Sequence, residues 1–175
     1  MIAGFPGQTS MSAFVIDAFE FCRVKERREG RIAVCDLSRL AEESADKFGA
    51  IHWSLQGGSD NRGHSQLLLS VSGSVRLICQ RCLTPFEFDV ASDSVLVLAR
   101  SDADADEIDA FLADDSVEVI VGSRTFNVAE LIEDEALLTI PLSAKHDVCP
   151  DQLAPDVERG AEKVSPFAVL KSLKQ

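Results

Sequence analysis

The chain of 175 residues is long enough for one ordinary domain with a sizeable core, and a hydrophobic content of 46% excludes disorder throughout. No apolar run approaches the roughly 20 residues of a membrane-spanning helix, and the first residues lack the order of a secretion signal, so we expect a cytoplasmic protein without a membrane partner. Acidic residues outnumber basic ones by 29 to 17, and the net charge of −12 repels polyanions as a whole.

The N-terminal part begins with residues 1–12, which are small, polar and turn-forming and predict a flexible arm. Residues 13–21 (AFVIDAFEF) follow as a predicted strand. The basic segment, CRVKERREGR at 22–31, then holds five of the seventeen basic residues. It is either a solvated turn or strand edge, or a patch that contacts phosphate groups. Its candidate binding residues are Arg23, Lys25, Arg27 and Arg28.

The clearest helical pattern covers residues 36–49 (DLSRLAEESADKFG). Asp36 is a suitable N-cap, because its carboxylate accepts a hydrogen bond from an unpaired backbone N–H of the first turn. Apolar side chains then recur at helical spacing as far as Phe48, and Gly49 supplies a left-handed stop. The pattern predicts one amphipathic helix that covers a core.

A series of strands is predicted next. Apolar residues alternate over 51–55, loop residues fill 57–65, and the odd positions from 67 to 79 are apolar except for Gly73. This alternation indicates a long, half-buried strand with a bulge or bend at the glycine. Alternation resumes at 86–90, residues 94–99 are again strand-like, and the short links favour an antiparallel meander.

Residues 101–115 (SDADADEIDAFLADD) contain seven acidic residues and no basic one. The alternating aspartates are similar to a calcium-binding loop, but the sixth position is Glu107 instead of glycine and the twelfth is Ala113 instead of glutamate, which argues against calcium. We interpret the segment as a solvated acidic loop, with a clamp for basic surfaces as the alternative.

Strand-like residues 117–121 precede a second predicted helix, which begins after Asn127, has Glu130 at the reciprocal capping position and ends before Pro141. Its predicted buried face consists of Val128, Leu131, Ile132 and Leu138. The acidic run 133–135 (EDE) lies in its second half, where the helix dipole disfavours negative charge. We therefore expect solvent, an arginine or a bound basic group to offset these charges. Neither a nucleophile nor a second base marks them as catalytic.

The segment 165–174 (SPFAVLKSLK) predicts a short docking helix near the C-terminus. Ser165 is a suitable cap, Pro166 suits the first helical position, and Phe167, Leu170 and Leu173 recur at helical spacing. An isolated helix of this length is marginal in water, so the segment is expected to dock either on its own domain or on a partner. Phe167 and Leu170 are therefore candidate binding residues.

Five cysteines is an odd number, and in a reducing cytoplasm metal binding or burial is favoured over a disulfide framework. Cys79 and Cys82 have C-x-x-C spacing, and His146 and Cys149 form a second pair with the same gap, which would complete a Cys3His tetrahedron around a structural zinc ion. The 63 residues between the pairs exceed the usual zinc-ribbon spacing. Three interpretations stay open: a metal site, a dithiol redox pair, and cysteines that are only buried or at a hairpin tip.

Three stretches together resemble the bacterial YceD proteins, the large ribosomal RNA subunit accumulation proteins, which also have plastid relatives. The stretches are CQRCLTPF at 79–86, EDEALLTIPLSAKHDVC at 133–149 and SPFAVLKSLK at 165–174, and with their order and spacing the resemblance spans about residues 13–174. Ala136 departs from the pattern, because the family usually has a larger aliphatic residue there. The positions that match are Cys79, Arg81, Cys82, Leu83, Pro85, Glu133, Asp134, Glu135, Pro141, His146, Cys149, Pro166, Phe167 and Leu170.

The resemblance implies a non-enzymatic ribosome biogenesis factor that supports synthesis, processing or stability of large-subunit (23S) ribosomal RNA. Its expected partner is pre-ribosomal RNA, contacted by the basic segment and Arg81, or a basic large-subunit ribosomal protein, which the net charge favours. The alternatives are a metal-dependent nuclease or hydrolase and a dithiol redox-responsive module, both built on Cys79, Cys82, His146 and Cys149. A catalytic zinc keeps an open position, which four protein ligands argue against.

These patterns predict an α+β protein in which an antiparallel, partly closed β-sheet carries two main helices and a short C-terminal helix. Residues 13–175 are expected to form a single YceD-like domain after the arm at 1–12. The acidic loop at 101–115 and the docking helix at 165–174 are expected to be parts of that domain.

Overall fold

The computed structural model describes residues 14–112 and 117–150. The predicted arm at 1–12 and the predicted docking helix at 165–174 lie outside the described residues, so both stay predictions. The elements in chain order are β1 (Val15–Ile16), α1 (Ala18–Arg23), β2 (Arg27–Ala33), the 3-10 helix η2 (Val34–Asp36), α2 (Ser38–Glu43), β3 (Ala50–Ser59), β4 (Ser65–Ile78), β5 (Pro85–Ala99), α3 (Asp102–Leu112), β6 (Val117–Val121), β7 (Phe126–Asn127) and α4 (Val128–Thr139).

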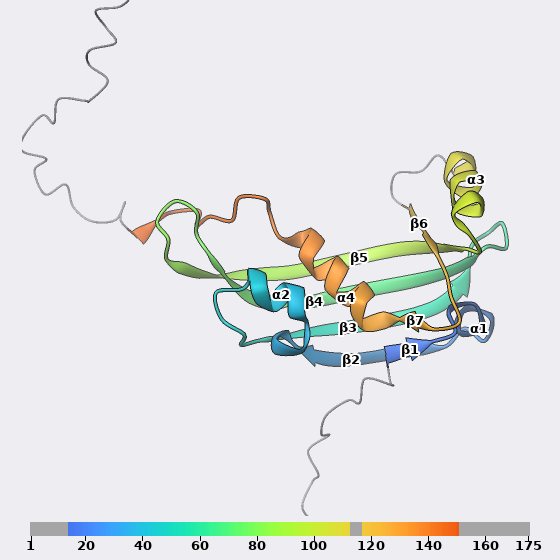
Figure 1. Ribbon diagram of the computed structural model, residues 1–175, viewed down its shortest axis with the longest axis horizontal. Helices are drawn as coiled ribbons and strands as arrows, with labels where there is room; N and C mark the ends of the chain where they lie inside the picture. The colour runs from blue at the N-terminus through green and yellow to red at the C-terminus, as the bar shows by residue number, and fades with distance from the viewer. Residues whose placement is uncertain (1–13, 113–116, 151–175) are drawn as a thin grey trace, which may run out of the picture.

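Five strands form one open sheet in the order β2-β3-β4-β5-β6, and β1 pairs with β7 in a separate small sheet (Figure 1). Strands β2 to β5 are antiparallel neighbours, so the predicted α+β fold with an antiparallel sheet is confirmed. β6 is parallel to β5, because α3 carries the chain back between them. Among the described strands, the edges β2 and β6 do not pair with each other, so the sheet is not closed into a barrel.

Helices pack on both faces of this sheet. α2 and α4 lie side by side over one face (Figure 1), where Leu96 and Leu98 of β5 join the main core. α3 packs through Ile108 on Val97 and Ala99, which are the alternate residues of the same strand. Because successive side chains of a strand point to opposite faces, α3 covers the opposite face at one end of the sheet.

The central strand β4 has the burial that its alternating sequence predicts. Its odd-numbered residues from 67 to 77 are buried, apart from the half-buried Gly73. The register runs without a break through this glycine, which pairs with Ile51 on one side and Val90 on the other. Of the predicted bulge or bend, the bulge is therefore wrong. A Cβ atom at position 73 would lie 2.6 Å from the carbonyl oxygen of Ala50, so the glycine permits the close approach of β3.

The predicted strand at 13–21 is mostly wrong, because β1 contains two residues and α1 follows at once. Asp17 starts α1, since its side chain accepts a hydrogen bond of 3.0 Å from the backbone N–H of Glu20. The second half of the basic segment forms β2 at the edge of the sheet, as the strand-edge interpretation expects.

The predicted acidic loop at 101–115 is also wrong, because most of it forms α3. The backbone N–H of Asp104 donates to Ser101 Oγ at 3.2 Å, and the Asp104 carboxylate accepts from the backbone N–H of Arg100 at 2.8 Å. This exchange is a variant of the capping box, and acidic residues in the first turn suit the positive end of the helix dipole. A Ser-x-x-Asp pattern therefore starts this helix, which the high content of acidic residues did not predict.

The first predicted main helix is shorter than expected, and another element caps it. α2 covers Ser38–Glu43, and Asp36 is not its N-cap. Instead, Oε1 of Glu133 in α4 accepts hydrogen bonds from the backbone N–H groups of Arg39 at 2.7 Å and Leu40 at 3.2 Å. These two N–H groups belong to the second and third residues of α2. In most helices, the side chain of the N-cap residue accepts a hydrogen bond from one of these two positions.

The C-terminal end of α2 is set by the neighbouring strand. Ser44 adopts an extended conformation, and the backbone N–H of Ala45 donates to the carbonyl oxygen of Arg76 in β4 at 2.6 Å. Phe48, which the helical pattern assigned to the buried face, is 80% exposed. A tertiary hydrogen bond therefore replaces the last predicted turns of the helix.

The second main helix, α4, begins where predicted. Asn127 accepts a hydrogen bond from the backbone N–H of Ala129 at 3.1 Å and donates through Nδ2 to Glu130 at 2.9 Å. Val128 and Ile132 are buried, as expected. The prediction for Leu138 is wrong, because this side chain is 75% exposed.

The acidic run 133–135 holds α4 against the rest of the protein. An arginine, one of the expected partners, is present: Arg39 of α2 lies 3.0 Å from the carboxylate of Glu133 and 2.5 Å from that of Asp134. The third carboxylate, of the buried Glu135, accepts hydrogen bonds from the hydroxyl groups of Ser92 and Ser94 in β5. Two buried carboxylates thus connect α4 to α2 and to the sheet.

We predict that Glu133→Ala lowers the free energy of unfolding by about 2 kcal/mol, because it leaves two α2 donors without their charged acceptor. Urea denaturation measures this change. The matched control is Asp134→Ala, which removes the same charge from the same arginine at a half-exposed position and should cost at most about 1 kcal/mol. Equal losses in the two variants would contradict the capping role of Glu133.

Candidate metal centre

The hairpin between β4 and β5 turns tightly at Cys79–Thr84. The backbone N–H of Cys79 donates to the carbonyl oxygen of Thr84 at 3.0 Å, and the N–H of Leu83 donates back to the carbonyl oxygen of Cys79 at 2.9 Å. Leu83 has a positive φ of 59° that lets the chain reverse here. The turn buries Cys79 and leaves Cys82 partly exposed, with both thiols at the tip.

The chain after α4 returns to this hairpin tip. Gln80 donates its backbone N–H to the carbonyl oxygen of Ala144 at 2.9 Å. The Arg81 guanidinium donates through Nη2 to the carbonyl oxygens of His146 at 2.6 Å and Asp147 at 3.4 Å. These bonds hold the second predicted ligand pair beside the first.

The four predicted ligand atoms converge, and all lie within 4.8 Å of one another. Cys79 Sγ lies 3.8 Å from Cys149 Sγ, and Cys82 Sγ lies 3.3 Å from His146 Nδ1. Two thiolates bound tetrahedrally to one zinc ion at about 2.3 Å would stand about 3.8 Å apart. The tertiary contact that the long sequence gap required is therefore present, and the cluster can hold a metal ion. All five cysteines are free thiols in the described residues.

Hydrogen bonds at the tip favour a thiolate. Burial raises the pKa of the Cys79 thiol, but backbone N–H groups of Cys82, His146 and Arg81 directed at its Sγ outweigh burial and lower the pKa to about 5. Burial raises the pKa of Cys149 to about 11, and its hydrogen bonds to Cys82 and Cys79 add to this effect. The pKa values of these two neighbouring thiols are thus shifted in opposite directions.

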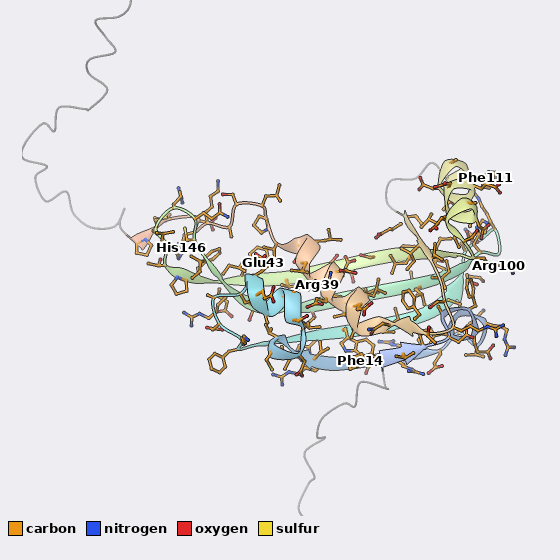
Figure 2. The ribbon with its side chains drawn as sticks, in the orientation of Figure 1. Phe14, Arg39, Glu43, Arg100, Phe111 and His146 are labelled. Carbon is orange, nitrogen blue, oxygen red and sulfur yellow. The ribbon has the colours of Figure 1, made fainter. Side chains whose placement is uncertain are left out.

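His146 is also positioned by an aromatic contact. Its ring lies 4.9 Å from that of Phe86, the second residue of β5. His146 of the cluster is at one end of the sheet. Arg100, just before the acidic helix α3, and Phe111, within α3, are at the other end (Figure 2). The centre and the most acidic element are therefore separate surfaces.

The basic segment is largely matched by neighbouring carboxylates. Arg23 lies 2.5 Å from Glu20, Arg27 lies 3.1 Å from Glu29, and Arg28 lies 2.8 Å from Glu26. Lys25 is exposed, with a φ of 53°. The structure does not bring this segment together with Arg81, which lies at the hairpin tip. Phosphate binding by these residues stays a prediction, as does the role of Phe167 and Leu170, which lie outside the described residues.

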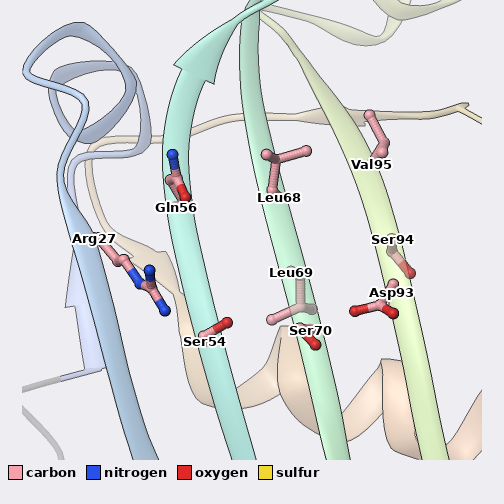
Figure 3. A pocket seen from close by; sticks show the side chains of 9 residues that line it. All are labelled: Arg27, Ser54, Gln56, Leu68, Leu69, Ser70, Asp93, Ser94 and Val95. Carbon is pink, nitrogen blue, oxygen red and sulfur yellow. The ribbon is translucent and has the colours of Figure 1, made fainter.

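The open face of the sheet carries both charge signs. A shallow pocket of about 220 Å³ lies on the face turned away from α4, and its lining residues come from β2, β3, β4 and β5 (Figure 3). Its described lining contains one base, Arg27, and one acid, Asp93, on opposite sides of serine and leucine residues. A surface that binds a phosphate backbone needs clustered positive charge, which this lining does not provide.

The sequence did not predict that Glu133 and Glu135 fix α4 to α2 and to β5. The run of three acids was visible, but the partners that these carboxylates bind lie in α2 and β5. The sequence also did not predict that Arg81, a predicted RNA contact, donates to the carbonyl oxygen of His146 in the ligand loop. The RNA contact of Arg81 stays a prediction.

A family model described as Large ribosomal RNA subunit accumulation protein YceD matches residues 67–174. This span includes both ligand pairs, the acidic run and the predicted docking helix. No solved structure matches the chain. In the part of the chain that the structure describes, every helix is too short or too polar to cross a membrane.

We predict that the metal-free protein shows a thiolate absorbance step near pH 5, from Cys79. Because this folded-state pKa is below the value of about 8.5 for an ordinary thiol, the thiolate contributes stability that is complete above the unfolded pKa. That contribution is lost as the pH falls through the folded pKa. Ultraviolet titration measures the step, which should vanish in Cys79→Ser and persist in Cys35→Ser. A step that survives in Cys79→Ser would refute the assignment.

Proposed function

The chain belongs to the YceD family of large ribosomal RNA subunit accumulation proteins, and from this membership we propose that it is a non-enzymatic factor for large-subunit biogenesis in the cytoplasm. It supports synthesis, processing or stability of the large-subunit ribosomal RNA. The observation that carries the proposal is the family match over residues 67–174, which coincides with the hairpin tip, the ligand loop and α4.

A structural role for the centre is supported by its ligand set. Three cysteines and one histidine would fill a tetrahedron, whereas a catalytic zinc keeps a position open for water or substrate. The buried carboxylates of Glu133 and Glu135 already accept hydrogen bonds from α2 and β5, and so serve the fold. These features favour a binding protein over a nuclease or hydrolase.

The partner that the charge distribution favours is a basic protein of the large subunit. The net charge is −12, and three arginines of the basic segment are already paired with carboxylates. In contrast, α3 exposes Asp102, Asp106, Glu107 and Asp109. Such a surface attracts Lys- and Arg-rich protein segments and repels a phosphate backbone.

Zinc is the metal that the donors fit best. Soft thiolates with one imidazole select zinc over hard cations such as magnesium or calcium, and a Cys3His set is a frequent structural zinc site. A bound ion would join the hairpin tip to the loop after α4, on top of the hydrogen bonds from Gln80 and Arg81. Arg81 then supports a ligand loop, in the way that outer-shell residues orient metal ligands.

We predict that depleting the protein from its native host causes a selective shortage of large ribosomal subunits in sucrose gradients. Wild-type protein should restore the large-subunit peak. A double variant of α3, Asp106→Asn with Asp109→Asn, should restore it poorly, because it removes two exposed charges but spares the capping residues of the helix.

The matched control is Arg27→Ala with Arg28→Ala, which should restore the large-subunit peak. The opposite pattern, in which the arginine variant fails and the α3 variant works, would assign the partner to RNA. A complex that weakens steeply with salt, with a salt dependence that flattens as the arginines are removed, would point the same way. An unchanged ratio of subunits after depletion would overturn the proposal as a whole.

We also predict that protein purified without added metal contains about one zinc ion per chain. Cys82→Ser should reduce the zinc content well below stoichiometry and lower Tm, because three ligands replace four. Cys35→Ser is the matched control, since Cys35 is exposed and outside the cluster. Elemental analysis and thermal unfolding measure both quantities. Wild-type protein that is free of metal and unaffected by a chelator would refute the zinc assignment.

A further inference from the structure

An apolar groove of about 510 Å³ lies beside the candidate metal centre. One wall is formed by the end of β4 and the hairpin tip, with Leu77, Ile78 and Leu83. The other wall is the end of α4 and the loop after it, with Leu137 and Leu142. The groove is therefore built by the two chain segments that also carry the four ligands.

Several apolar side chains of this groove are unusually exposed to solvent. Leu142 is fully exposed, Leu83 is 75% exposed and Ile78 is 43% exposed. Neighbouring exposed apolar residues that line one hollow mark an interaction surface, whereas single ones scattered over a surface need no explanation. The walls are also fixed in place: Gln80 donates to the carbonyl oxygens of Ala144 through its backbone N–H and of Leu142 through Nε2, at 2.9 and 3.3 Å. The groove is preformed.

We propose that this groove binds the chain's own segment 165–174 as an amphipathic helix. Its sequence, SPFAVLKSLK, places Phe167, Leu170 and Leu173 at helical spacing, which makes one apolar face for one apolar groove. A helix of this length is marginal in water unless its apolar face packs on another surface. The segment needs such a surface, and the groove is an uncovered one of matching character.

The position of the groove favours this occupant. The described chain ends at Pro150, next to the buried Cys149, at the same end of the sheet as the hairpin tip (Figure 1). The fourteen residues 151–164 then separate the described chain from the segment. As a flexible coil they would span about 20 Å on average, and fully extended up to about 50 Å. The walls include Ala144, five residues before Cys149, so the groove is within reach.

The charges agree with the same pairing. The charged residue of the described groove lining is Glu43, at the end of α2. The segment carries two bases, Lys171 and Lys174, and no acid. Opposite charge at the rim of an apolar contact fixes its register and orientation more than its strength.

Hydrogen–deuterium exchange of the full-length protein tests the proposal. We expect the amides of 165–174 to exchange at least ~10-fold more slowly than an unstructured chain, independently of protein concentration. Leu142→Glu in the groove and Leu170→Glu in the segment should each return these amides to the unstructured rate. Leu138→Glu is the matched control, because it places the same charge on an exposed leucine of α4 outside the groove lining, and it should leave the protection unchanged.

Unprotected amides in wild-type protein, or protection that survives Leu142→Glu while the fold stays intact, would overturn the proposal. Protection that rises with concentration, together with a dimer in size-exclusion chromatography, would overturn it in favour of a second copy of the chain. Far-ultraviolet circular dichroism and zinc content establish that each variant is folded. The proposal does not depend on the ribosomal role, since exchange on the isolated protein and subunit profiles after depletion fail or succeed separately.

Discussion

The return of the chain to the β4–β5 tip is the constraint on which the candidate metal centre and the apolar groove depend. Gln80 and Arg81 donate to carbonyl oxygens of the loop after α4, and so bring His146 and Cys149 back beside a pair that stands more than sixty residues earlier. The same contact sets the distance between β4 and the end of α4. The ligand cluster and the apolar groove are thus two consequences of one loop position.

That loop position requires α4 to be fixed on the sheet, and buried carboxylates provide this. An uncompensated buried charge is strongly unfavourable, so Glu133 and Glu135 are tolerated only where donors surround them. Glu133 finds these donors at the N-terminus of α2, and Glu135 finds them in two serine hydroxyl groups of β5. These donors surround the two carboxylates only when α4 lies in its observed position against α2 and β5. The carboxylates therefore specify this position of α4 and also stabilise it.

The sequence predicted the parts of this protein that are repeated or local, and failed where a distant group intervened. Period-two alternation found β4, and the Asn127 cap found α4, since both signals lie within the element itself. The end of the first main helix could not be found, because it is set by a hydrogen bond from Ala45 to β4. The acidic helix α3 was missed for another reason: seven acids suggested solvent, although Ser101 and Asp104 form a local start signal. The ligand set was predicted from its spacing, but only the fold shows that the pairs meet.

The arrangement also divides the molecule into two ends with different physical sensitivities. At one end lie the cysteine and histidine ligand cluster and the apolar groove, and salt in solution screens contacts between buried groups little. At the other end, α3 presents exposed carboxylates whose attraction for a basic surface falls within about a Debye length, roughly 8 Å at physiological salt. The sheet separates the two ends, and its open face between them carries mixed charges. Added salt is therefore expected to weaken electrostatic attraction at the acidic end and to leave contacts at the hairpin-tip end largely unchanged.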